Sequence, residues 1–436
     1  MSTVKIGLLG FGTIGTGVVR NFQRNATIIQ ERLGHGLELV KIADLDIDTD
    51  RGVQLEAGVL TTDVDDVLSH PEIDIVIELI GGYEPAKSFI LKAIANGKHI
   101  VTANKALMAV HGQEIITAAN RQGVVVMFEA AVGGGIPIIS AIKENLCSNE
   151  FSSILGILNG TCNFILTKMT DEGSDFAPVL QEAQELGYAE ADPTFDIEGV
   201  DTAHKIALLS ALCFGTTVDF DQVYTEGISN ISAIDIQFAE QMGYKIKLLA
   251  IGKNLGEHIE VRVHPTMIPG SYQLAEVNGV FNAVRLNGDF VGPTLLYGSG
   301  AGMDATASAV MGDVMAISRD QISGARSRVP IMGYRADQIK SLPIKAMSEI
   351  VSHYYLRFTT LDQPGVLATI AGSLGRYDIS IQSMIQPEGQ EGGSVSIVLM
   401  THAAKEADII NALQEIEQLD IISQPTRLIR VEHDLD

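Results

Sequence analysis

The sequence is poor in cysteine and lacks any long apolar run. Its three cysteines, Cys147, Cys162 and Cys213, are spaced for neither a disulfide framework nor a zinc site, which fits a reducing compartment. No run of about eighteen apolar residues occurs, so we expect no membrane span. The first residues lead directly into a strand pattern without the features of a signal peptide, and this favours a cytoplasmic protein.

Basic residues are also scarce relative to acidic ones. Lys and Arg total 30 against 54 Asp and Glu, so the formal net charge at pH 7 is -24. The basic residues form no stripe, and we therefore expect no nucleic-acid partner. A hydrophobic content of 46% and a charged content of 19% are typical of a soluble globular chain, and 436 residues predict about three domains.

The N-terminal part predicts a doubly wound, Rossmann-type α/β domain. An apolar strand at residues 4–10 leads into a G-x-G-x-x-G fingerprint and then a helical pattern, which is the context that a dinucleotide-binding motif requires. Further buried parallel strands are expected at residues 38–44, 74–80, 99–103 and 124–130. The fingerprint residues predicted to contact the cofactor are Gly10, Phe11, Gly12, Thr13, Ile14 and Gly15.

A carboxylate stands at the end of the second predicted strand. At that position Asp44 would accept a hydrogen bond from a ribose 2′-hydroxyl and would repel a 2′-phosphate. Arg51 lies seven residues further on, which the sequence alone does not link to a phosphate. The local pattern favours NAD without excluding NADP.

Two lysines stand where chemistry is expected. Lys205 shares one face of a buried helix with Asp201, near the helix N-terminus, where both the macrodipole and burial oppose an ammonium group. The pair is either an N-capping Asp with a Lys stem lying along apolar surface, or a site of proton transfer. Lys105 follows the strand at 99–103, at the sheet edge where ligands bind, or else it is a solvated turn residue.

An acidic cluster precedes Lys205. It indicates either a solvated loop or a pocket for a cationic amine, and its members are Glu190, Asp192, Asp196, Glu198 and Asp201. Thr161, beside Gly160 at a predicted helix start, would either cap that helix or bind a substrate carboxylate.

Six segments together resemble the homoserine dehydrogenase family over essentially the whole chain. They are GFGTIGTG (10–17), TANKALMA (102–109), FEAAVGGGIPII (128–139), ILNGTCNFIL (157–166), LGYAEADPTFDIEGVDTAHK (186–205) and YGSGAGMDATASAVMGD (297–313). The resemblance implies interconversion of L-homoserine and L-aspartate 4-semialdehyde with NADP or NAD, at the branch leading to threonine, isoleucine and methionine.

The resemblance also implies roles for single residues. Lys205 and Lys105 would flank the substrate's side-chain oxygen, with Asp201 positioning Lys205. Glu190 would bind the substrate ammonium, and Asp196, Thr161 and Lys105 would complete the substrate pocket. Lys105 and Gly302, in a glycine-rich segment, would also approach the cofactor. A monovalent cation such as Na+ is implied at Glu129, Val132, Gly134 and Ile136.

The C-terminal part alternates as βαββαβ, which predicts a ferredoxin-like module with a turn at 387–393. With Asp362 and Gly365 at its first strand-to-helix turn it resembles an ACT domain, an amino-acid-binding regulatory module. Gly365 would allow close approach of an effector, with threonine as the expected one, although a dimerisation module that binds nothing has the same pattern. Paired modules of this kind predict a homodimer or homotetramer.

The predicted organisation has four parts. Residues 1–133 form the dinucleotide-binding domain, which residues near 300–320 complete, and residues 134–299 form an α+β substrate-binding and oligomerisation domain. A linker at 321–351 precedes the ACT domain at 352–436. Two rival functions stay open: a non-catalytic metabolite sensor, and another NAD(P)-dependent semialdehyde dehydrogenase that would use Cys162 as its nucleophile.

Overall fold

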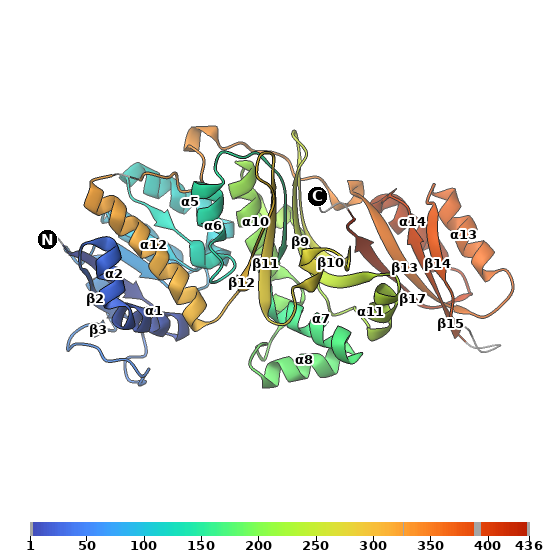
Figure 1. Cartoon of the computed structure of the whole chain (residues 1–436), viewed down its shortest axis with the longest axis horizontal. Coiled ribbons are helices and arrows are strands. Elements are labelled where there is room, and N and C mark those ends of the chain that lie inside the picture. Colours follow the sequence, from blue (N-terminus) through green and yellow to red (C-terminus); the bar gives the residue numbers. More distant parts are fainter. Residues whose placement is uncertain (1–2, 326, 388–393, 434–436) are drawn as a thin grey trace. The chain divides into compact units, whose positions relative to one another are not determined.

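The computed structural model describes residues 3–325, 327–387 and 394–433, and the chain folds into two compact units. Unit 1 contains residues 1–160, 201–221 and 281–342, and unit 2 contains residues 161–200, 222–280 and 343–436 (Figure 1). Both units are therefore discontinuous in the sequence. Among the residues described, no helix is long and apolar enough to cross a membrane.

Unit 1 is built on a six-stranded sheet whose order is β3-β2-β1-β4-β5-β6 and whose neighbours all run parallel. This is the order of a doubly wound dinucleotide-binding fold, which confirms the predicted fold class. The strands are β1 (Val4–Leu9), β2 (Leu37–Ala43), β3 (Leu60–Thr61), β4 (Ile75–Glu78), β5 (His99–Thr102) and β6 (Val126–Met127). The helices that accompany them are α1 (Thr13–Arg24), α2 (Ala26–Leu33), α3 (Asp65–Leu68), α4 (Ala86–Ala95) and α5 (Lys105–Gln122).

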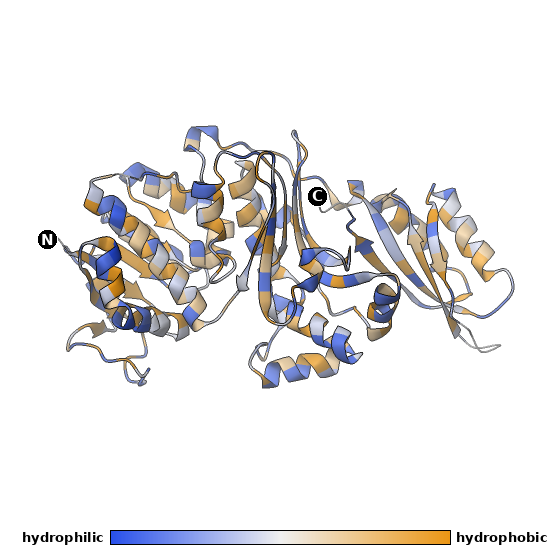
Figure 2. Ribbon diagram, viewed as in Figure 1, coloured by the Kyte–Doolittle hydropathy of each residue, from blue (hydrophilic) through white to orange (hydrophobic). Residues whose placement is uncertain are grey.

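The core of this sheet is apolar on both faces. On one face the strands contribute Ile6, Leu8, Ile75 and Ile77, and on the other Leu9 and Val76, all nearly inaccessible, so the strand sequences are continuous hydrophobic runs. Figure 2 shows the same concentration of hydrophobic residues on the strands. A late helix, α12 (Met303–Ser323), packs on α1, and the contact is close because a glycine stands at position 17 of α1.

The rest of unit 1 comprises a buried helix, three antiparallel strands and several short helical turns. The strands are hydrogen-bonded in the order β12-β11-β7, and they are β7 (Phe151–Ile157), β11 (Phe281–Gly288) and β12 (Gly292–Ser299). Nearly every residue of α10 (Val200–Phe214) is buried, as its apolar sequence predicts. The remaining elements are η1 (Glu129–Ala131), α6 (Ile138–Ser140), a π-helical turn η2 (Ala141–Asn145), η3 (Phe220–Gln222) and η5 (Ala336–Gln338).

Unit 2 contains a second set of strands in the order β9-β10-β17-β13-β15-β14, with β8 beside β10 and β16 beside β13. These are β8 (Tyr224–Thr225), β9 (Tyr244–Asn254), β10 (Ile259–Pro269), β13 (Val351–Leu361), β14 (Ile381–Ile385), β15 (Ser394–Thr401), β16 (Ala404–Lys405) and β17 (Ile422–Val431). The helices are α7 (Gly160–Glu172), α8 (Phe176–Glu185), α9 (Thr194–Ile197), α11 (Ala233–Gln241), η4 (Gln273–Glu276), η6 (Met347–Glu349), α13 (Val366–Arg376) and α14 (Glu406–Ile416).

The C-terminal module, residues 351–433, has the predicted βαββαβ order of β13, α13, β14, β15, α14 and β17. Its core lies between the sheet and the two helices and includes Leu356, Phe358, Ile370 and Ile409. The predicted turn at 387–393 lies outside the described residues from position 388 onward.

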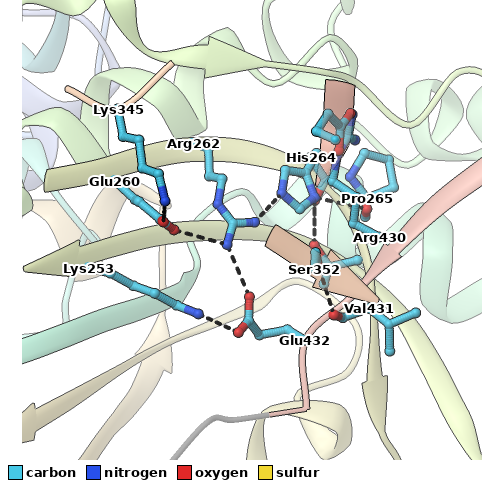
Figure 3. Close-up of polar contacts among 12 residues, drawn as sticks. Lys253, Glu260, Arg262, His264, Pro265, Lys345, Ser352, Arg430, Val431 and Glu432 are labelled. Atoms are coloured by element: carbon cyan, nitrogen blue, oxygen red, sulfur yellow. Dashed lines mark hydrogen bonds and ion pairs between the residues drawn. The ribbon is translucent and has the colours of Figure 1, made fainter. Parts of the chain in front are cut away.

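Buried charges join this module to the rest of unit 2. Arg262 on β10 is 3% exposed and contacts Glu260, Glu432 just after β17, and the ring of His264 (Figure 3). Lys253 also pairs with Glu432. Burial and the neighbouring cations keep the pKa of His264 far below its ordinary value, so this ring is neutral and can accept a hydrogen bond from Arg262.

A second buried ion pair joins Arg357 of β13 to Asp235 of α11. Arg357 donates to Asp235 of α11 from Nε at 2.6 Å and from Nη2 at 2.9 Å, and the Tyr355 hydroxyl donates to the same carboxylate at 2.8 Å. Such a pair stabilises the fold only while it is complete, because each partner has lost its hydration.

Replacing Arg357 with methionine keeps most of its volume but leaves Asp235 without a cation. We expect a loss of about 3–5 kcal/mol, seen as a lower Tm in thermal unfolding followed by circular dichroism. The matched control is Arg376→Met, which removes a partner of Glu415 at an exposed site and should lower Tm much less, because water screens the pair. Equal Tm shifts in the two variants would contradict this account of the buried pair.

Candidate active site

The fingerprint turn between β1 and α1 depends on two of its three glycines for steric reasons. Gly10 has φ +93°, and a Cβ there would lie 2.8 Å from the Leu79 carbonyl. A Cβ on Gly15 would lie 2.2 Å from the Gly10 oxygen. At Gly12, just before α1, a Cβ would meet nothing within 4 Å. The turn therefore leaves open space at the helix N-terminus, which fits a bound pyrophosphate.

The structure brings Arg51 to Asp44, a proximity that their separation in the sequence does not reveal. Asp44 accepts the Phe11 N–H at 2.5 Å, and the Arg51 guanidinium lies 3.8 Å from the other Asp44 oxygen and 4.7 Å from the centroid of the Phe11 ring. A carboxylate and a guanidinium thus stand together at the end of β2, beside the fingerprint turn.

Asp201 lies between the two lysines that the sequence singled out. Its Oδ2 accepts from Lys205 Nζ at 2.6 Å and from Asn159 Nδ2 at 2.9 Å, and its Oδ1 lies 2.7 Å from Lys105 Nζ. Lys205 Nζ also donates to the Leu158 carbonyl at 2.7 Å. The first turn of α10, the start of α5 and the end of β7 therefore meet at one carboxylate.

Burial differs among these three side chains. Side-chain exposure is 2% for Asp201, 9% for Lys205 and 34% for Lys105. Burial alone would raise the pKa of Asp201, but the charges and hydrogen bonds of Lys205 and Lys105 outweigh it, so the pKa lies below the ordinary value. The carboxylate stays ionised and fixes both ammonium groups.

Three nearby groups were not predicted as part of the site. Asn159 and the Leu158 carbonyl precede α7, and only the Asn-Gly pair at 159–160 signals a turn there. His204 stacks on Phe220 with ring centroids 4.1 Å apart, and burial lowers its pKa to about 4, so the ring is neutral at pH 7.

The other predicted substrate residues belong to unit 2. The Thr161 hydroxyl donates to the Tyr188 carbonyl at 2.6 Å and lies 3.4 Å from Asp196 Oδ2, whereas Glu190 is exposed. Members of the acidic cluster have different partners, because Asp192 accepts the Thr194 N–H, Glu198 accepts the Ser229 hydroxyl, and Asp201 holds the lysines.

The segment predicted to hold a cation is largely engaged with protein donors. Each carboxylate oxygen of Glu129 accepts a backbone N–H at 2.7 Å, from Ile139 and from Ser140, and the Ile136 carbonyl accepts the N–H of residue 138. Lys143 is buried close by and repels a second cation. Among the described residues no group of three or more Asp, Glu, His or Cys side chains could hold a metal ion. Two of the four predicted ligands, Glu129 and Ile136, thus already accept hydrogen bonds from the protein.

Two further predictions concern a glycine and a cysteine. Gly302 precedes α12 with φ +109°, and a Cβ there would meet nothing within 4 Å. Cys162 is fully buried in α7 and its Sγ contacts the Asp196 carbonyl at 3.2 Å. A thioester-forming nucleophile needs access to its substrate, so the geometry of Cys162 disfavours the rival semialdehyde dehydrogenase.

The parallel sheet with its glycine turn and the buried Lys–Asp–Lys arrangement define a nicotinamide-dependent oxidoreductase. Residues 10–129 match the NAD-binding domain of homoserine dehydrogenase, residues 137–315 match the homoserine dehydrogenase family model, and residues 354–420 match the ACT domain.

Known relatives agree over the full length. The chain is 48% identical to the homoserine dehydrogenase of Pseudomonas aeruginosa over 435 residues and 39% identical to that of Bacillus subtilis over 433 residues, with 99% of each chain covered in both cases. The crystal structure of a homoserine dehydrogenase from Thiobacillus denitrificans superimposes with a TM-score of 0.94 at 48% identity, covering 99% of each chain. The chain belongs to the homoserine dehydrogenase family.

The glycines of the fingerprint permit a matched test of cofactor binding. Gly12→Ala adds a methyl group where the structure leaves space, so we expect parental thermal stability but at least about tenfold weaker NAD(P) binding, because the methyl group occupies the approach to the helix N-terminus. Gly15→Ala should lower both Tm and affinity, because its Cβ overlaps a backbone oxygen. Calorimetric titration and thermal unfolding measure the two effects, and unaltered affinity in Gly12→Ala would exclude the turn as the phosphate site.

Proposed function

We propose that this chain interconverts L-homoserine and L-aspartate 4-semialdehyde, with Lys205 and Lys105 as the proton-transfer groups. The observation that carries the proposal is the buried carboxylate of Asp201 between the two ammonium groups. A metabolite sensor has no use for two cations held so close to a sheet edge where ligands bind.

The chain's residues divide the work of the reaction. The reduced nicotinamide, when bound, supplies the hydride. Lys205 and Lys105 stabilise the negative charge that develops on the substrate oxygen, and one of them gives it a proton. Asp201 keeps both Nζ atoms in place, so no reorganisation is needed when the charge forms. In the opposite direction the same lysine, as a neutral amine, accepts the proton from the alcohol.

Substrate binding is assigned to the acidic segment of unit 2. Glu190 is exposed, so its carboxylate is accessible to an ammonium group, and Asp196 with Thr161 would complete the pocket.

We further propose that the domain boundaries lie at residues 133, 299 and 351, and that the protein acts in the cytoplasm. A Na+ site at Glu129, Val132, Gly134 and Ile136 stays a prediction from the family resemblance, and we assign it no step.

Regulation by threonine through the C-terminal module is also proposed. Gly365 precedes α13 with φ +91°, and a Cβ there would meet nothing within 4 Å, so the backbone is open to a small ligand. Assembly into a homodimer or homotetramer would pair such modules. Turnover measured with and without L-threonine, and sedimentation of the intact chain, test these two proposals.

Removing the buried lysine tests the central claim. Lys205→Met keeps the side-chain volume, and we expect kcat for homoserine oxidation to fall by about 10²–10⁴-fold, because the proton-transfer group is lost. The dinucleotide affinity should stay near the parental value. The change in nicotinamide absorbance gives the rate with NAD and with NADP.

The matched control is Lys247→Met, which removes another buried lysine whose Nζ donates to the Val277 carbonyl in unit 2. It should lower stability but keep most of the turnover. A parental enzyme that binds dinucleotide but oxidises no homoserine would exclude the proposed function and favour the sensor.

Asp44 and Arg51, at the end of β2, predict how substitutions change the preference between NAD and NADP. Asp44→Asn keeps an acceptor for the Phe11 N–H but removes the charge that repels a 2′-phosphate, so the NADP-to-NAD ratio of kcat/KM should rise about tenfold, equivalent to about 1.4 kcal/mol. Arg51→Ala should lower the same ratio, because the Arg51 guanidinium is the nearby positive charge that could attract the 2′-phosphate of NADP. Shifts in the same direction for both variants would refute this assignment.

A further inference from the structure

A fully buried carboxylate, that of Glu78, stands at the end of β4. Glu78 has no exposed surface, and no ion pair is formed by it among the residues that the structure describes. Its Oε1 accepts the N–H groups of Ile80 at 2.7 Å and Gly81 at 3.1 Å, and its Oε2 accepts the Thr102 hydroxyl at 2.7 Å. Burying a carboxylate costs free energy because its hydration is lost, and here three hydrogen bonds replace that hydration.

On one side the hydrogen bonds lead to Lys105. The Thr102 hydroxyl gives its hydrogen to Glu78 and accepts the Asn104 N–H at 3.0 Å, so its direction is fixed by the carboxylate. Asn104 in turn caps α5, accepting the Leu107 N–H at 3.1 Å. Lys105 is the first residue of α5, so Glu78 orients the backbone immediately before the lysine that contacts Asp201.

On the other side they lead to the fingerprint turn. The backbone of Leu79 and Ile80 lies so close to Gly10 that a Cβ there would sit 2.8 Å from the Leu79 carbonyl and 3.1 Å from the Ile80 nitrogen. The loop continues through Gly81 and Gly82, and the Gly82 carbonyl accepts the side-chain amide of residue 104 at 2.7 Å. The Glu78 carboxylate therefore links two segments: the loop at 79–82, which packs against the fingerprint turn, and the start of α5.

We propose that Glu78 is a positioning residue for the reaction, setting where Lys105 stands relative to the dinucleotide turn. The inference rests on the proposed function, but every contact that carries it lies within unit 1. The hydrogen bonds described for Glu78 go to Ile80, Gly81 and Thr102, so its effect on Lys105 passes through Thr102 and Asn104. Displacements of about 1 Å in a reacting group are enough to slow catalysis by about 10²-fold.

A carboxylate is needed because all three of its partners are donors. Glutamine at position 78 keeps the shape of the side chain, but it replaces one carboxylate oxygen by an NH2 group, which is a donor. It would have to point that group either at two N–H donors or at the Thr102 oxygen, which would then accept from residues 78 and 104 and would have to turn its own hydrogen away from position 78. Valine at position 102 removes the hydroxyl, whereas serine keeps it.

The experiment compares Glu78→Gln, Thr102→Val and Thr102→Ser in the full-length protein. We expect kcat to fall about tenfold or more in the first two, with KM for homoserine within about threefold of the parent and a dinucleotide Kd raised only in Glu78→Gln. Thr102→Ser should restore most of kcat. Thr401→Val is the control, since Thr401 is equally buried and also accepts a backbone N–H, from Tyr354, in the C-terminal module.

A double-mutant cycle separates positioning from bulk stability. If Glu78 acts through Lys105, then Glu78→Gln should cost little further kcat once Lys105→Ala is present. Additive losses in this cycle, parental kcat in Thr102→Val, or an equal loss of kcat in Thr401→Val would each overturn the proposal. If Glu78→Gln fails to fold, the two Thr102 variants decide.

Failure of the proposed function would be recognised separately. A parental protein without homoserine turnover refutes the reaction, but the effect of Glu78→Gln on dinucleotide Kd still reports whether the carboxylate shapes the cofactor turn. An unchanged Kd in that variant would overturn this part of the inference independently of activity.

Discussion

The site depends on one buried carboxylate, that of Asp201, which lies between two positively charged lysine side chains. Asp201 has lost its hydration, and it remains ionised because Lys205 and Lys105 compensate for that loss. Remove either cation and the remaining charges are left in a medium that solvates them poorly. The same constraint holds the lysine Nζ atoms within hydrogen-bond distance of fixed oxygens, which is what a group needs in order to stabilise charge without moving.

Buried carboxylates recur in this protein, and their partners distinguish their roles. Asp201 pairs with two lysines, and Asp235 pairs with Arg357 and joins two parts of unit 2. Glu78, within the part of the chain that the structure describes, accepts from N–H and O–H donors and forms no ion pair. Both oxygens of each carboxylate lie against a hydrogen-bond donor or a cation, which is the condition under which a protein interior tolerates a charge. The apolar cores supply cohesion, whereas these groups determine which segments stand next to each other.

Much of the fold could be predicted from periodicity and motif context. The parallel strands of unit 1 are continuous apolar runs, and the C-terminal module shows the alternation of strands and amphipathic helices that defines a ferredoxin-like fold. The site could be predicted only in part. Lys205 and Asp201 are four residues apart on one helix, so their contact follows from local geometry, but Asn159 comes from a turn 42 residues away.

By itself the sequence determined the class of fold and the glycine turn, because these follow from local rules of backbone geometry and hydrophobic periodicity. It also singled out the two lysines, whose roles came from the family resemblance. Only the tertiary structure decided that Lys105 and Lys205 share one carboxylate and that Arg51 lies against Asp44. It also decided that Glu78 accepts a hydrogen bond from Thr102, three residues before Lys105. The contacts of Asp201 with Lys105 and of Glu78 with Thr102 join residues from different segments of the chain. Glu78 and Thr102 meet because the parallel strands β4 and β5 bring their carboxyl ends to one edge of the sheet.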